Sequence, residues 1–121
     1  MSTTRTITLT DRRPVTISEA EWPLIASYDD RPGSMRQGTP VPDYETDRHT
    51  IRVRQHADGR AVVYGVLDAA TAWTGTESRR GGELLAAGAD LAAAIARVGE
   101  DCGILDAVIR GCVADLPAET I

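Results

Sequence analysis

The residues best able to do chemistry in this sequence are its arginines, because the chain carries 13 arginines and no lysine. Arg48, Arg52, Arg54 and Arg60 lie close together along one stretch. A guanidinium group can bind a phosphate through two parallel hydrogen bonds, so an aligned row of them would form a basic stripe that meets nucleic-acid phosphates. Aromatic residues that would stack on bases are not interleaved with these arginines. Nucleic-acid binding through this row is therefore an alternative hypothesis.

Carboxylates supply a second candidate surface, because acidic charge is concentrated at the end of the chain. Residues 83–121 contain seven acidic residues and two arginines, which accounts for the whole net charge of -5. A negative helical surface could engage a basic protein partner, including a groove that normally holds nucleic acid. A further acidic cluster with a tyrosine lies in an irregular segment. The predicted partner-binding residues are Asp43, Tyr44, Glu45, Asp47, Glu100, Asp101, Asp106 and Asp115.

Catalytic and metal-binding patterns do not emerge from the spacing of the remaining reactive residues. His49 and His56 are seven positions apart, so a regular strand would direct them to opposite faces. Cys102 and Cys112 fall on apolar helix faces and are expected to be buried, reduced thiols. No nucleophile elbow or phosphate-binding glycine fingerprint is present. We therefore assign no catalytic, cofactor or metal residues; a small enzyme using Tyr44, His49 or His56 is a further alternative.

The elements that position these residues begin with strands. Threonines alternate with Ile7 and Leu9, and Val15 and Ile17 resume the alternation after a turn, which predicts a hairpin. Ser18 and Glu21 have the spacing of a capping box, which predicts a helix over 18–28 that is short or bent at its proline. Residues 29–48 have no periodicity and predict a long irregular loop.

A second hairpin is predicted over residues 50–67, turning at Asp58 and Gly59. Loops of two or four residues would place the apolar side chains on one face and the arginines on the other. That expected apolar face consists of Ile51, Val53, Val62, Tyr64 and Val66. One more strand is expected within residues 69–85. Apolar residues at helical spacing then predict two helices, from Leu91 and from Leu105, the second closed by Pro117.

Together these elements predict a single α+β domain over residues 1–121. Its predicted order is β-β-α-β-β-β-α-α, with an antiparallel sheet of about four or five strands packed on helices. No signal peptide or membrane-spanning run is recognisable, so a cytoplasmic protein is expected, without a membrane partner. A homodimer would bury apolar area that a small domain cannot cover alone.

The leading functional hypothesis is a small, acidic, non-enzymatic protein-binding module. It would act as an inhibitor or adaptor from a bacterial accessory or mobile element, and an anti-CRISPR antagonist is the concrete example. Its partner would be a protein, plausibly one with a basic nucleic-acid-binding surface.

Overall fold

Strands dominate the first two thirds of the chain and helices the last third. The computed structural model describes residues 3–30, 35–36, 39–40, 47–71 and 75–117. The strands are β1 (Thr4–Thr8), β2 (Pro14–Ser18), β3 (Leu24–Asp30), β4 (Met35–Arg36), β5 (Thr39–Pro40), β6 (Asp47–Gln55), β7 (Ala61–Thr71) and β8 (Gly75–Leu85). The helices are α1 (Leu91–Cys102) and α2 (Asp106–Asp115). These elements confirm the predicted α+β class.

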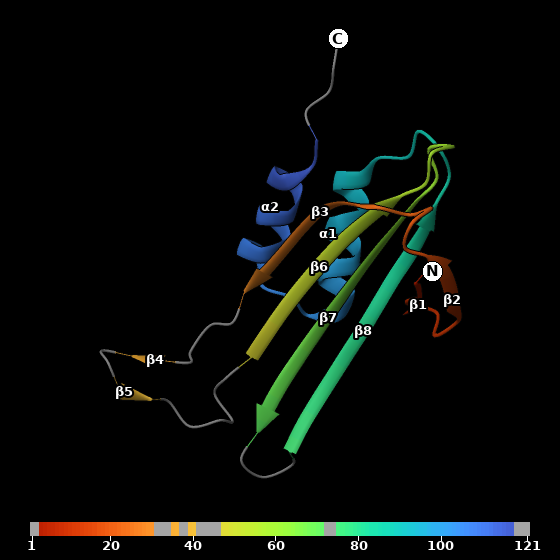
Figure 1. Cartoon of the computed structure of the whole chain (residues 1–121). Helices are drawn as coiled ribbons and strands as arrows, with labels where there is room; N and C mark the ends of the chain where they lie inside the picture. The colour runs from red at the N-terminus through yellow and green to blue at the C-terminus, as the bar shows by residue number, and fades with distance from the viewer. Residues whose placement is uncertain (1–2, 31–34, 37–38, 41–46, 72–74, 118–121) are drawn as a thin grey trace.

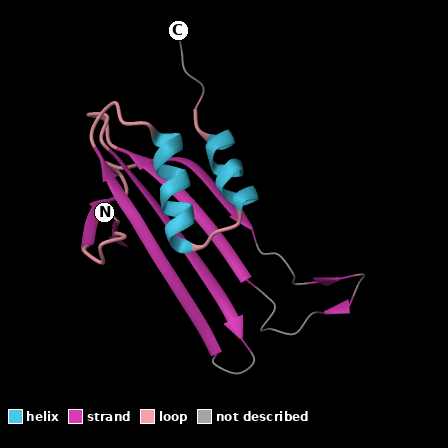
Figure 2. Cartoon of the chain, turned by 180° about the vertical axis from the view of Figure 1, so that it is seen from behind, coloured by secondary structure: helices cyan, strands magenta, loops and turns pink. Residues whose placement is uncertain are grey.

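The main sheet is antiparallel, with strand order β3-β6-β7-β8. Both helices lie across one of its faces, which Figure 2 shows from the helix side. The hairpin β1–β2 lies at the β8 edge of the sheet (Figure 1) and packs on the opposite face. We call that opposite face, which the helices do not cover, the open face.

The core under the helices forms because every second residue of β6 and β7 points toward them. Ile51, Val53 and Val63 are fully buried there, against Ile95 and Val98 of α1.

The side chain of Asp90 accepts a hydrogen bond from the Ala93 N–H at 3.1 Å and caps α1. Gly103, in the left-handed conformation with φ of 74°, ends it. Both helices thus form close to their predicted positions.

A second, smaller apolar cluster lies between the hairpin and the open face. Ile7, Leu9 and Ile17 of the hairpin region pack with Trp22 over the side chains that β7 sends to that face. This cluster explains why β7 carries consecutive apolar residues: both of its faces are buried near the hairpin. Val62 and Tyr64 are the β7 members of the cluster.

The predicted helix over 18–28 is wrong. Only one turn forms, in which the N–H groups of Glu21 and Trp22 donate to the carbonyl oxygen of Ser18 at 3.1 and 2.9 Å. Pro23 has no N–H to continue the turn, and the chain extends into β3, which pairs with β6. The expected order therefore becomes β-β-β before the central segment. The anticipated proximity of Ile17 and Trp22 does occur, within the hairpin cluster.

The predicted register of the second hairpin is also wrong, by one residue. Val53 pairs with Val63, and Arg52 pairs with Tyr64. Val62, Tyr64 and Arg54 therefore share the open face, where apolar residues were not expected beside arginine. The observed register is stable because the N-terminal hairpin buries the apolar side chains of Val62 and Tyr64 on the open face.

The segment predicted as an irregular loop over 29–48 is partly regular. Asp29 and Asp30 complete β3 and pair with Thr50 and His49, which draws both ends of the segment into the sheet. The short strands β4 and β5 pair between them. Asp47 and Arg48 begin β6, and residues 31–34, 37–38 and 41–46 lie outside the described residues. Within the described residues, neither helix has the length and apolar character needed to cross a membrane.

Candidate nucleic-acid interface

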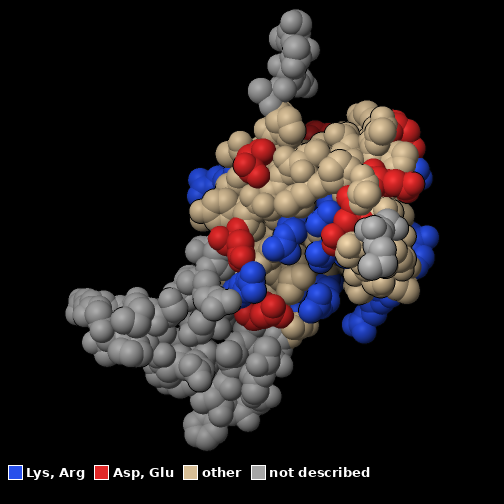
Figure 3. Space-filling view, viewed as in Figure 1, with Lys and Arg blue, Asp and Glu red and all other residues tan. Residues whose placement is uncertain are grey.

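Three of the four predicted arginines lie on the open face. Arg48, Arg52 and Arg54 occupy alternate positions of β6, so their side chains leave the sheet on the same side, away from the helices. Figure 3 views this face and shows arginine atoms gathered in its middle, beside the N-terminal hairpin, with carboxylates around them. Three members of the predicted row therefore share one face of the sheet, but they differ in their partners.

Arg48 is neutralised by an acidic neighbour. Its Nε and Nη2 atoms donate to the two carboxylate oxygens of Asp29 at 3.2 and 2.8 Å, and Thr50 Oγ1 donates to Asp29 at 3.0 Å. The hydrogen bond from Arg48 lowers the pKa of Asp29, an effect that burial partly opposes. This bidentate pair fastens β3 to β6 and leaves Arg48 little free charge for a ligand.

Arg54 is a structural residue. Its side chain is buried, and its Nε donates to the hydroxyl oxygen of Tyr64 at 2.9 Å. Its Nη1 donates to the carbonyl oxygen of Trp22 at 3.2 Å. Arg54 thus connects the hairpin cluster to the sheet, and the cluster covers its side chain.

Arg60 lies apart from the row, in the turn between β6 and β7. Its Nε donates to Asp58 at 2.8 Å, and its guanidinium carbon lies 5.2 Å from the centroid of the Trp22 ring. Arg52 is half-buried and makes no hydrogen bond or ion pair with the described residues. Of the four predicted arginines, Arg52 alone combines a place on the open face with an unpaired charge in the described structure.

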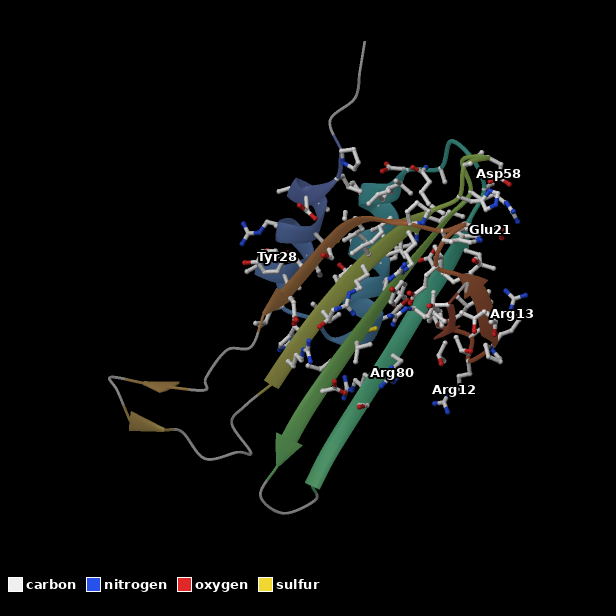
Figure 4. All side chains as sticks on the ribbon, viewed as in Figure 1. Arg12, Arg13, Glu21, Tyr28, Asp58 and Arg80 are labelled. Atoms are coloured by element: carbon white, nitrogen blue, oxygen red, sulfur yellow. The ribbon has the colours of Figure 1, made fainter. Side chains whose placement is uncertain are left out.

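Sequence reasoning missed three further arginines beside this face. Arg80 of β8 is exposed on the same side as Arg52, while Arg79 follows the opposite side of the edge strand. Arg12, in the turn of the N-terminal hairpin, lies at the same end as Arg80 (Figure 4). Two Arg-Arg doublets, at 12–13 and 79–80, could have indicated these residues. They lie outside the stretch that forms β6 and its turn, where the predicted row was placed.

These three arginines line a groove of about 600 Å³ between the hairpin turn, the edge of β8 and the end of α1. It is lined by Thr8, Thr10, Arg12, Ser78, Arg79, Arg80 and Asp101. Hydroxyl groups and guanidinium groups together are typical donors to oxyanions. Arg80 lines the groove and lies on the same face of the sheet as the arginines of β6, two strands away.

The predicted acidic contact surface is only partly assembled. Glu100 and Asp101 are exposed in the last turn of α1, and the short connection to α2 brings Asp106 to the same end of the helical layer. Asp106 pairs with Arg110 at 2.9 Å. Asp115 lies at the other end of α2, where it accepts a hydrogen bond from the Ser27 N–H at 2.8 Å. Asp43, Tyr44, Glu45 and the side chain of Asp47 lie outside the described residues.

Cys102 and Cys112 lie in the core under the helices, whereas His56 lies beside Arg60 at the turn between β6 and β7. His49 is buried on the helix side, where its Nδ1 accepts from the Leu105 N–H at 3.2 Å. His56 contacts Trp22 near the hairpin and borders a cavity of about 480 Å³. Burial raises the pKa of the Cys102 and Cys112 thiols to about 11, so both are inert, neutral core groups. No cluster of three or more metal-ligating side chains occurs among the residues described.

Comparison with known proteins gives no match to a protein-family model, to a curated protein or to a solved structure. The function must therefore be inferred from the charged and polar groups of the chain itself.

Proposed function

We propose that this protein is a non-enzymatic binding module that holds the phosphate backbone of a nucleic acid on the open face of its sheet. The observation that supports this most is the placement of Arg52 and Arg80 on the sheet face that the helices do not cover, each without an ion-pair partner in the described structure. Unpaired guanidinium groups on a flat face are suited to phosphates, which they can bind in bidentate fashion.

The spacing of the two arginines suits two phosphates. Arg52 aligns with Tyr64 and Gly82 across the sheet, so Arg80 lies two strands away and two residues along. From ordinary strand geometry the two Cα atoms are about 12 Å apart. Two flexible side chains at that separation can contact different phosphates of one strand.

The negative net charge does not prevent such binding, because the charge is unevenly distributed. The acidic excess lies in residues 83–121, most of which form the helical layer behind the sheet. At physiological salt the Debye length is about 8 Å, so charges on the far layer are largely screened from a ligand on the open face. We expect modest affinity that depends strongly on salt. The buried thiols, free of disulfides, suit a cytoplasmic setting.

A salt titration tests this proposal. Fluorescence anisotropy with single-stranded and duplex oligonucleotides should detect binding at low salt, with log K falling linearly against log salt. Arg52→Gln should reduce that slope by about 0.7 to 0.9, as expected for one lost phosphate contact. The control is Arg110→Gln, which removes an exposed arginine from α2 and should leave the slope unchanged. Absence of binding by the wild type at low salt would refute the proposal.

The acidic end of the helical layer supports a second candidate function. Glu100 and Asp101 lie in the last turn of α1, where carboxylates oppose the helix dipole and where the helix has no basic residue. Their placement therefore does not serve helix stability. It favours contact with a basic protein, so that the module would act as an inhibitor or adaptor, as an anti-CRISPR antagonist does. Pulldown from a host lysate with wild type and Asp101→Asn/Asp106→Asn should then lose a partner; identical partner sets would exclude this candidate.

A further inference from the structure

The groove beside β8 is built from three parts of the chain that are distant in sequence. Thr8, Thr10 and Arg12 come from the first hairpin, while Ser78, Arg79 and Arg80 come from the edge strand and Asp101 from α1. The backbone joins two of these parts: the Thr10 N–H donates to the Gly82 carbonyl oxygen at 2.9 Å, and the Gly82 N–H donates to Thr10 Oγ1 at 3.2 Å. The groove is therefore a fixed feature of the folded chain.

Arg12 is held in an unfavourable backbone conformation at the rim of this groove. Its φ is 70°, and among the described residues it is the only one other than glycine with a positive φ. Glycine or asparagine normally occupies such a turn position, because a larger side chain has to bear the left-handed conformation. The Arg12 N–H donates to the Leu9 carbonyl oxygen at 2.8 Å, which closes the turn. A costly residue at this position is consistent with a role for its side chain.

The charges in the groove match one class of ligand. None of its three guanidinium groups makes an ion pair or side-chain hydrogen bond within the described structure, and its lining includes one carboxylate, Asp101. The lining residues therefore carry a net charge of plus two, and the Asp68 carboxylate, which accepts a hydrogen bond from Ser78, lies outside the lining. A phosphate monoester carries close to two negative charges and three terminal oxygens, whereas an internal phosphodiester carries one charge and two free oxygens.

We infer that the groove binds the terminal phosphate of a nucleic-acid strand whose backbone lies on the open face. Arg80 belongs to both surfaces, so a strand that contacts Arg52 and Arg80 would end at the hairpin turn. This inference rests on the proposed function, since it names the kind of strand that the open face holds. The shared chemistry is the phosphate monoester, which a free nucleoside monophosphate also carries.

The test compares one oligonucleotide with a terminal phosphate, at either end, against the same oligonucleotide with hydroxyl ends. At one fixed salt concentration, the wild type should bind a phosphorylated form on the order of tenfold more tightly. Arg12→Gln should remove most of this preference. Arg13→Gln is the matched control, because Arg13 is the adjacent exposed arginine and does not line the groove. Equal affinity for all three forms, or a preference that survives Arg12→Gln, would overturn the inference.

Failure of this inference can be distinguished from failure of the proposed function. If all oligonucleotides bind equally, the open face binds nucleic acid and the groove inference is wrong. If no oligonucleotide binds but inorganic phosphate or a nucleoside monophosphate shifts the Arg12 amide resonance, the groove is a phosphate site and the proposed function is wrong. Arg12→Gly guards against misfolding, because glycine suits the backbone at this position. This variant should fold and still lose the preference.

Discussion

Arg54 and Tyr64 form a buried hydrogen bond between neighbouring strands, from the arginine Nε to the tyrosine hydroxyl oxygen at 2.9 Å. The two residues lie under the N-terminal hairpin and are about 8% and 7% exposed. The same guanidinium reaches the Trp22 carbonyl oxygen and lies 4.0 Å from a carboxylate oxygen of Glu19. One arginine therefore joins β7 to the connection between β2 and β3 at the point where the hairpin meets the sheet.

Removing the Tyr64 hydroxyl should destabilise the protein. Tyr64→Phe leaves the Nε–H of Arg54 without its partner in a buried site, which costs about 1–3 kcal/mol. Urea denaturation followed by tryptophan fluorescence would measure this loss. Tyr28→Phe is the control, because Tyr28 is 41% exposed. A loss of equal size in both variants would contradict a specific role for the Arg54 hydrogen bond.

The Arg12 turn should gain stability when its strain is removed. Arg12→Gly accommodates a φ of 70° without a side-chain clash and should raise the free energy of unfolding by roughly 0.5–1 kcal/mol. Arg13→Gly should lower it, because glycine there only adds freedom to the unfolded chain. Thermal denaturation of both variants measures the two signs. A destabilising effect of Arg12→Gly would show that the left-handed backbone conformation of Arg12 does not lower the stability of the folded protein.

Local periodicity was sufficient to predict the two C-terminal helices and the strands β6 and β7, but it assigned the residues of β3 to a helix. Leu91 onward has a 3.6-residue apolar repeat, a capping aspartate and a terminating glycine, and α1 follows these signals. The register of β6 and β7 was not predictable in the same way, since the choice depended on whether one or both faces of β7 are covered. Val62 and Tyr64 are buried by Ile7 and Trp22, contacts that no local pattern contains.

The candidate site shows the same limit. The alternation of Arg48, Arg52 and Arg54 correctly predicted a shared face, because strand alternation is a local property. Their partners are not local: Asp29 neutralises Arg48 from β3. The groove depends on Arg12, Arg80 and Asp101, which are brought together only by the packing of the hairpin and α1 against β8.

Two helix glycines should be intolerant of a methyl group. A Cβ on Gly99 would lie 2.4 Å from Ile109 of α2, and one on Gly111 would lie 2.4 Å from the Tyr28 ring. Alanine normally stabilises a helix interior relative to glycine by about 1 kcal/mol, but the contacts here should reverse that sign. We expect Gly99→Ala to cost about 1–3 kcal/mol through overpacking at a buried site.

The loss of stability caused by Gly111→Ala should be smaller than that caused by Gly99→Ala, because Tyr28 is partly exposed and its ring can move outward. Chemical denaturation of both variants would establish this order. Stabilisation by Gly99→Ala would show that α1 and α2 are not packed as closely as the structure indicates.

The Asp29–Arg48 pair should contribute to stability only when the carboxylate is ionised. Arg48 lowers the pKa of Asp29 below 3.8 in the folded state, so its contribution is present above about pH 4 and is lost as the pH falls through the folded pKa. Both side chains are 43% exposed, so screening by solvent keeps this contribution small. Asp29→Asn should remove this part of the acid dependence, measured as unfolding free energy between pH 5 and pH 2. An unchanged acid profile would mean that the pair is not formed in solution.

The two buried thiols should make the fold sensitive to alkali. Burial raises the pKa of Cys102 and of Cys112 from 9.0 to about 11, so the unfolded chain loses these protons first as the pH rises. The contribution of the neutral thiols to stability is therefore fully present below about pH 9. It is lost between pH 9 and pH 11, because ionisation of the thiols favours the unfolded state. The variants Cys102→Ala and Cys112→Ala should each have a lower free energy of unfolding than the wild type at pH 8. Between pH 8 and pH 10, however, that free energy should fall less in each variant than in the wild type. Native thiols should also react with a disulfide reagent at pH 8 much more slowly than unfolded ones, because the raised pKa lowers the thiolate fraction and burial blocks the reagent. Equal reaction rates in the folded and unfolded protein would show that α1 and α2 open readily from the sheet.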